Sequence, residues 1–200
     1  NMGVISNGTT LLDAGALDSG IATGAMTLLS TLTASSSANL TFASGISSTY
    51  KEYIFKFIDI HPATDNVGFT ANFRDGSSAY DATKTTTHFY AYHSEGDSAA
   101  AFGYRTDQDL AQATGTLNLG IPVGADADQC ITGTLRLFEP SSTTFVKHFL
   151  TNVSMSGSAN DVHNSYASGY CNVTAAIDGV QFAMTSGNID AGTIKMYGIK

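Results

Sequence analysis

The chain has 200 residues, of which 42% are apolar and only 13% are charged, so it can bury a sizeable core and is not disordered by charge. Its net charge of −8 and its nine scattered lysines and arginines argue against binding of nucleic acid through the phosphate backbone. No run approaches the roughly 18 apolar residues of a membrane span, so we expect no membrane insertion.

Residues 1–25 differ from the rest of the chain. Residues 3–25 include five glycines and no aromatic residue, with small apolar residues such as Leu11, Leu12 and Ile21 between them. This is too much glycine for a stable helix and too much apolar character for a free linker. We expect either an attachment arm that orders against a neighbouring subunit or a frayed terminus on its own domain. The predicted domain boundary lies between residues 25 and 26.

From residue 26 onward, apolar residues recur with a period of two. Residues 66–74 place apolar side chains at every odd number, which predicts a half-buried strand. Residues 52–60 are apolar on both faces, which predicts a central strand covered on each side. The other predicted strands are residues 28–33, 38–42, 87–93, 116–123, 131–138, 144–153, 165–173, 179–184 and 192–199.

Turn residues separate these segments, and no convincing amphipathic helical stretch occurs. Residues 94–115 are the exception, because they could contain a helical turn or form a connection that crosses between sheets. About ten short strands predict an all-β fold. We expect an antiparallel β-sandwich with jelly-roll topology over residues 26–200, preceded by an extended N-terminal arm.

Catalytic motifs are missing from the sequence. There is no Gly-x-Ser-x-Gly nucleophile elbow, and Ser48 and Lys51 match Ser-x-x-Lys only where a strand begins. His88 and His93 are five residues apart, which places them on opposite faces of one strand. We therefore expect a non-enzymatic protein without a catalytic metal.

Calcium could bind at two loops that hold paired carboxylates. Asp126 and Asp128 form one pair, and Asp75 and Asp81 form the other. Calcium takes six to eight oxygen ligands, and each loop supplies two carboxylates plus backbone carbonyls. A solvated loop tip is the favoured interpretation of both. Cys130 and Cys171 could form one disulfide or remain two buried thiols.

One region is dense in aromatic residues and suggests sugar recognition. Pyranose rings stack on aromatic faces and hydrogen-bond to carboxylates and amides. Tyr90 and Tyr92 share one strand face with His88. The candidate glycan-binding residues are Tyr80, Asp81, His88, Tyr90, Tyr92 and Tyr104. The alternative is ordinary packing of tyrosines on a sheet.

Five segments resemble virion structural proteins of marine bacteriophages, cyanophage-like ones in particular. They are residues 28–42, 48–65, 137–149, 165–177 and 184–197, and they extend over most of the predicted sandwich. The resemblance implies a tail-fibre, head-fibre or capsid-decoration protein, and it brings no catalytic residues with it.

Two functional hypotheses follow. The first is a non-enzymatic virion component, made in the bacterial cytoplasm and exposed on the particle surface. It would contact other capsid or tail proteins through its N-terminal arm, and as a homo-oligomer we expect a trimer. The second is a lectin-like module that binds a host surface glycan.

Overall fold

The computed structural model describes residues 4–6, 9–13, 16–17 and 26–200. Strands β1 (Val4–Ser6), β2 (Thr9–Asp13) and β3 (Ala16–Leu17) form a separate three-stranded antiparallel sheet. The remainder of the expected attachment arm lies outside the described residues, so the arm stays a prediction. In the described ranges, no helix has the length and apolar character needed to cross a membrane.

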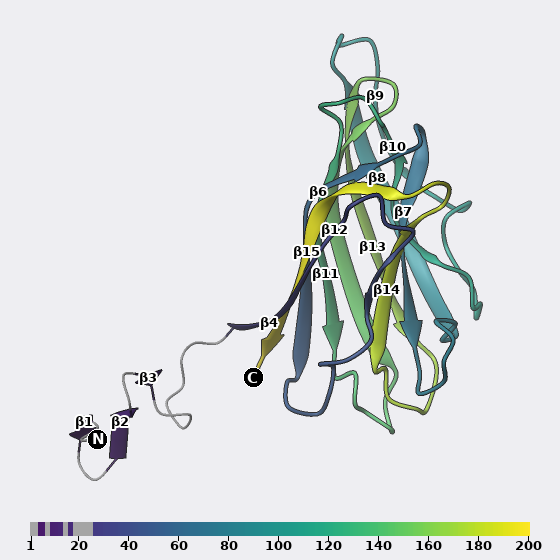
Figure 1. Ribbon diagram of the computed structural model, residues 1–200. Coiled ribbons are helices and arrows are strands. Elements are labelled where there is room, and N and C mark those ends of the chain that lie inside the picture. The colour runs from purple at the N-terminus through teal and green to yellow at the C-terminus, as the bar shows by residue number, and fades with distance from the viewer. Residues whose placement is uncertain (1–3, 7–8, 14–15, 18–25) are drawn as a thin grey trace.

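Residues 26–200 form a sheet of twelve antiparallel strands (Figure 1). The strands are β4 (Met26–Thr33), β5 (Leu40–Phe42), β6 (Glu52–Pro62), β7 (Val67–Arg74), β8 (Lys84–Ser94), β9 (Ala100–Tyr104), β10 (Leu117–Val123), β11 (Ile131–Phe138), β12 (Lys147–Gly157), β13 (Asp161–Cys171), β14 (Gly179–Met184) and β15 (Ile189–Ile199).

Eight of these strands have jelly-roll topology. The first four pair with the last four in reversed order, as β4–β15, β5–β14, β6–β11 and β7–β10. The resulting ribbon rolls up through two further pairs, β15–β6 and β14–β7. The prediction of an all-β jelly-roll sandwich is therefore confirmed.

Two inserted hairpins widen one layer of the sandwich. The β8–β9 hairpin is inserted between β7 and β10, and the β12–β13 hairpin between β11 and β14. They add to the free side of β11 in the order β12, β13, β8, β9. We call these four strands the extension. The larger layer thus runs from β4 through β15, β6 and β11 to β9, and β10, β7, β14 and β5 form the smaller one.

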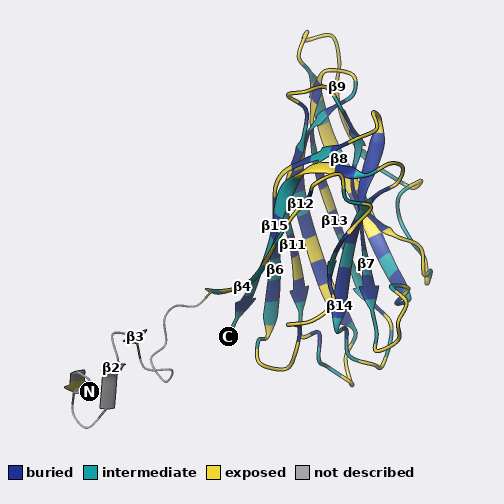
Figure 2. Cartoon of the chain, viewed as in Figure 1, coloured by how far each residue is buried: buried dark blue, intermediate teal, exposed yellow. Residues whose placement is uncertain are grey.

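The core lies between the two layers and contains a cluster of aromatic rings among aliphatic side chains. Phe182 on β14 packs against Phe55 and Phe57 on β6, with ring centroids 5.5 and 5.2 Å apart. Phe69 on β7 meets Phe57 at 5.2 Å. All four rings are at most 1% exposed. Figure 2 shows the alternation of buried and exposed residues along the strands that the two-residue period predicts.

Two local expectations differ from the structure. Strand β6 is interior to its sheet, but only one of its faces is fully buried, because the smaller layer covers one side and Ile58 on the other is 39% exposed. Residues 94–115 contain no helix. They contain strand β9, which was not predicted, and most of the crossing between layers, which was one of the two alternatives, because residues 105–116 connect β9 in the larger layer to β10 in the smaller one. From Arg105 to Ala113 the chain then follows the edge of β8, where Thr86 N donates to Leu110 O at 2.9 Å.

Candidate binding surface

The outer face of the extension, turned away from the smaller layer, carries a concentration of exposed apolar side chains. The structure describes eleven large apolar residues as exposed, and six of them lie on this face. These six are Phe89, Phe102, Tyr104, Leu150, Val162 and Tyr166. They share a face because cross-strand partners in an antiparallel sheet point to the same side, as Phe89 does with Tyr104 and with Tyr166.

Three of these rings form a continuous row across neighbouring strands. Phe89 lies between the other two, with its centroid 5.9 Å from that of Phe102 and 5.1 Å from that of Tyr166. The Phe89 and Tyr166 rings are nearly parallel, at an interplanar angle of 11°. Contacts between neighbouring rings restrict the side-chain conformations of all three residues, so the row is a preformed apolar ridge.

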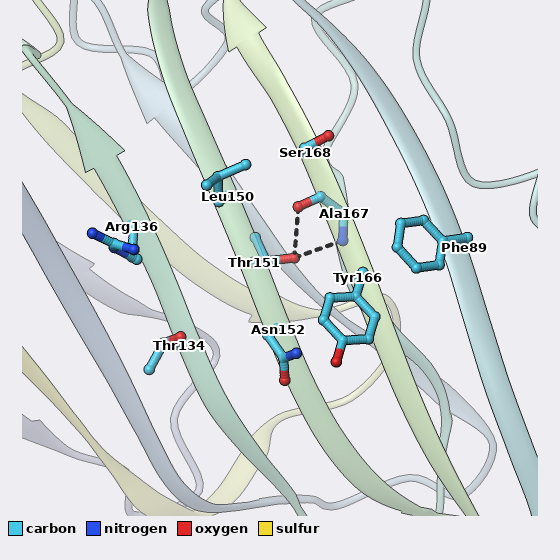
Figure 3. Close-up of a pocket in the computed structure, with 9 residues that line it drawn as sticks. All are labelled: Phe89, Thr134, Arg136, Leu150, Thr151, Asn152, Tyr166, Ala167 and Ser168. Carbon is cyan, nitrogen blue, oxygen red and sulfur yellow. Dashed lines mark hydrogen bonds between the residues drawn. The ribbon is translucent and has the colours of Figure 1, made fainter.

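A shallow groove with a volume of about 470 Å³ runs beside this ridge. Its floor is β12, and its sides are residues of β11 on one hand and of β13 and β8 on the other (Figure 3). The lining residues are Phe89, Thr134, Arg136, Leu150, Thr151, Asn152, Tyr166, Ala167 and Ser168. Under the floor, Thr151 Oγ1 donates to Ala167 O at 3.2 Å and accepts from Ala167 N at 3.0 Å, which ties β12 to β13.

Arg136 supplies the positive charge of the groove. Its guanidinium donates to the Glu52 carboxylate on β6 and lies 5.2 Å from the centroid of the Phe138 ring. Both contacts restrain a long side chain that would otherwise be free. The groove therefore combines an aromatic side, an oriented guanidinium, and the polar groups of Thr134, Asn152 and Ser168.

The inner face of the extension holds Tyr90 and Tyr92, two of the candidate glycan-binding residues. Their rings stack on the buried imidazole of His163, at centroid distances of 6.1 and 5.1 Å. Arg105 lies 5.2 Å from the Tyr90 centroid on its other side. The His163 Nε2 atom is 3.1 Å from Asp161 Oδ2. Both tyrosines are thus packed among neighbours and only partly exposed.

His88 and Tyr104 do not join that cluster as accessible ligands. His88 is 1% exposed, neither of its ring nitrogens has a partner, and burial lowers its pKa to about 4, so the ring is neutral. Tyr104 lies on the outer face opposite Phe89, and its hydroxyl donates to Asp109 at 2.6 Å.

Tyr80 and Asp81 lie at the other end of β8. The Tyr80 ring packs 5.6 Å from the Arg74 guanidinium carbon, beside the end of β7. Between Lys84 and Tyr90 a strand advances about 20 Å, so Tyr80 and Asp81 cannot share a pocket with Tyr90. The structure keeps His88, Tyr90 and Tyr92 on one face of β8, with His88 buried, and separates them from Tyr80, Asp81 and Tyr104.

Neither proposed calcium loop is part of a larger ligand cluster. Asp126 and Asp128 are exposed, and Asp126 forms a turn with Gln129, whose backbone N–H donates to Asp126 O at 2.8 Å. Throughout the described ranges, no three His, Cys, Asp or Glu side chains are grouped as metal ligands. Solvated loop tips stay the favoured prediction for both loops, with calcium binding as the alternative.

Two buried lysines flank a buried cysteine on the inner face. Lys147, Cys171 and Lys84 are register partners on β12, β13 and β8, and all three are 0% exposed. Lys84 Nζ donates to Gly115 O at 2.7 Å, and Lys147 Nζ donates to Val173 O at 2.6 Å. Burial lowers the pKa of Lys84 to about 8 and raises the pKa of Cys171 to about 12.

Both cysteines are free thiols in the structure. Cys130 lies beside Ser156, whose N–H donates to Cys130 O at 3.0 Å, near the start of β13. Cys171 ends that strand, about 30 Å away at the usual advance per residue, so the two cannot form a disulfide in this fold.

Comparison with protein-family models, curated proteins and solved structures finds no match to this chain. The resemblance to phage virion proteins stays a prediction.

The sequence analysis missed Phe89, Leu150 and Tyr166 as surface residues. The two-residue period does place the side chains of Leu150 and Phe149 on opposite faces of their strand, and likewise those of Tyr166 and Ala167. Local sequence does not reveal that β12, β13 and β8 are neighbours, so the gathering of these side chains could not be predicted.

Proposed function

We propose that the protein is a non-enzymatic structural component of a bacteriophage particle, exposed on the particle surface, which contacts other virion proteins through the outer face of the extension. The observation that supports this most strongly is the concentration of exposed apolar side chains on that face. Monomeric proteins rarely expose large contiguous apolar patches, and such patches mark interaction sites.

The chemistry of the face favours a protein partner. Aromatic residues and arginine are enriched in protein interfaces, and the outer face offers Phe89, Tyr166 and Arg136. Residues 1–25 remain the proposed attachment arm, and either a decoration or a fibre position suits the proposal. Self-association remains part of the proposal, and the edge strand β9 favours a two-fold pair over the trimer expected from the sequence.

Reconstitution tests this proposal. The purified full chain is added to particles that lack it, and the bound fraction is measured after sedimentation. A variant carrying Leu150→Ser and Tyr166→Ser is expected to lose most binding, whereas Ile58→Ser, an exposed apolar residue of the same layer outside the extension, binds as the unmodified chain does. Full binding by the double variant would contradict the proposal that the outer face contacts other virion proteins. Removal of residues 1–25 tests the arm separately.

The groove favours one second candidate, carbohydrate binding. A sugar ring could stack on Tyr166 while Arg136 and Asn152 hydrogen-bond its hydroxyls. A glycan array with the unmodified chain tests this. We expect Tyr166→Ala to abolish binding and Tyr92→Ala to leave it unchanged, because Tyr92 packs on His163 at the inner face. Absence of binding by the unmodified chain would rule the candidate out.

A further inference from the structure

The twelve-stranded sheet has three edge strands, β4, β5 and β9, and the first two are protected against pairing with another strand. Strand β4 has a register shift in its pairing with β15, whereas β10 is not an edge because it pairs with β7 and, at Val123 and Gly157, with β12. Strand β5 has only three residues. Bulges, proline and short length are the usual means by which proteins prevent edge-to-edge association.

Strand β9 has none of these protections. Its pairing with β8 is regular over five residues, and its sequence, Ala-Ala-Phe-Gly-Tyr, contains no charge and no proline. Phe102 at its centre is 75% exposed. An uncharged, regular, apolar edge strand is a template for pairing with another chain.

The hydrogen-bond pattern shows which backbone groups of β9 are free. Arg105 N donates to His88 O at 2.8 Å, and Ser94 N donates to Ala99 O at 2.9 Å, so residues 99, 101, 103 and 105 point toward β8. The N–H and C=O groups of Ala100, Phe102 and Tyr104 therefore point away from the sheet. In the described part of the chain, β8 is the one strand that pairs with β9.

We propose that β9 pairs antiparallel with β9 of a second copy of this chain, about a two-fold axis at Phe102. In that register Phe102 faces Phe102 of the second copy, and Ala100 faces Tyr104. Every residue with outward backbone groups then meets another such residue, which satisfies all six donors and acceptors. The intervening partners are Ala101 and Gly103, whose small side chains leave room on the inner face.

The side chains of the outer face support the same pairing. Tyr166, Phe89 and Phe102 form a row that ends at the β9 edge. Two-fold pairing brings two such rows together end to end, and it buries Phe102, the most exposed ring of the row, against its own copy. Self-complementary contacts of this kind are the commonest in homo-oligomers. A second copy is therefore the occupant that this edge fits best.

Light scattering with the full chain tests the proposal. The unmodified protein is expected to have twice the 20.8 kDa mass of one chain. Phe102→Lys places two like charges opposite each other at the axis and is expected to give the single-chain mass. Phe145→Lys is the matched control, because Phe145 is also 75% exposed but lies between β11 and β12; this variant keeps the double mass.

Disulfide trapping distinguishes the two-fold register from other contacts. Hydrogen-bonded antiparallel partners have Cα atoms about 5.5 Å apart, within reach of a disulfide. Phe102→Cys is expected to form a covalent dimer on mild oxidation, and Phe145→Cys is not. A single-chain mass for the unmodified protein overturns the proposal. A double mass that persists in Phe102→Lys also overturns it, as does a double mass that is lost only when residues 1–25 are removed. Failure of Phe102→Cys to form a covalent dimer overturns it as well.

Discussion

The larger layer of the sandwich has two halves that differ in which of their side chains are buried. In the half formed by β4, β15, β6 and β11, the smaller layer covers one face, and aromatic rings such as Phe55 and Phe57 fill the space between. In the extension, the inner face buries Lys84, His88 and Lys147 beside apolar residues, and the outer face leaves a row of rings exposed.

Residues that stabilise the fold and residues that are available for binding thus lie in different parts of the larger layer. The side chains on the inner face of the covered half have apolar contacts on all sides, so they serve stability. The extension consists of two hairpins that the jelly roll does not need for closure, and its outer rings contribute little to the core. Substitutions should therefore affect stability in one half and association in the other.

The largest effect is expected in the covered half. Phe182→Ala removes a ring that contacts Phe42, Phe55, Phe57 and Phe69, and should lower the free energy of unfolding by about 3–5 kcal/mol in urea denaturation. Phe89→Ala on the outer face should cost about 1 kcal/mol or less, because that ring is 37% exposed. Equal losses would remove the distinction between the halves.

The buried lysine predicts a pH dependence that belongs to the extension. Because folding lowers the pKa of Lys84 to about 8, the unfolded chain binds more protons between pH 8 and the ordinary lysine pKa. Stability should therefore rise with pH in that window, by at most about 3 kcal/mol. Cys171 acts oppositely: its raised pKa makes stability fall above the ordinary thiol pKa.

The two contributions can be separated by substitution. In Cys171→Ala, the free energy of unfolding should rise between pH 8 and 10. Burial also lowers the pKa of Lys147, so both lysines are replaced in the second variant, Lys84→Met with Lys147→Met, in which the free energy of unfolding should fall across the upper part of that range. Urea denaturation at each pH measures both slopes. The same slope in both variants would contradict the assigned shifts.

Close packing within the extension gives a smaller, local effect. A Cβ at Gly169 would lie 2.3 Å from Thr85 O on β8, so Gly169→Ala should push β8 from β13 and cost about 1–3 kcal/mol. Amide hydrogen exchange should accelerate in β8 and stay unchanged in β14. Gly96→Ala, which meets nothing within 4 Å, is the control and should leave exchange unaltered.

The smallest effect on stability is expected where the effect on binding is largest. Leu150→Ser and Tyr166→Ser change side chains that are 47% and 40% exposed, so each should shift the free energy of unfolding by about 0.5 kcal/mol. Thermal and urea unfolding of the double variant check this. A loss of several kcal/mol would make Leu150 and Tyr166 structural residues.

The sequence predicted the sandwich because its signals are local. Alternation in residues 66–74 and 131–138 gave strands at β7 and β11, and turn residues separated them. Strand β9 was missed, because Ala100–Tyr104 has no clear alternation and follows a polar turn. The candidate site could not be predicted, since it depends on β12, β13 and β8 being neighbours, which is a non-local property.

The proposed contact between the outer face of the extension and other virion proteins has a direct test. Hydroxyl-radical footprinting of the chain free and bound in particles tests it directly, with Phe145 as the internal reference. The account predicts that oxidation of Phe89, Leu150 and Tyr166 falls severalfold on binding while that of Phe145 is unchanged. Equal oxidation of those three residues in the free and bound states would contradict it.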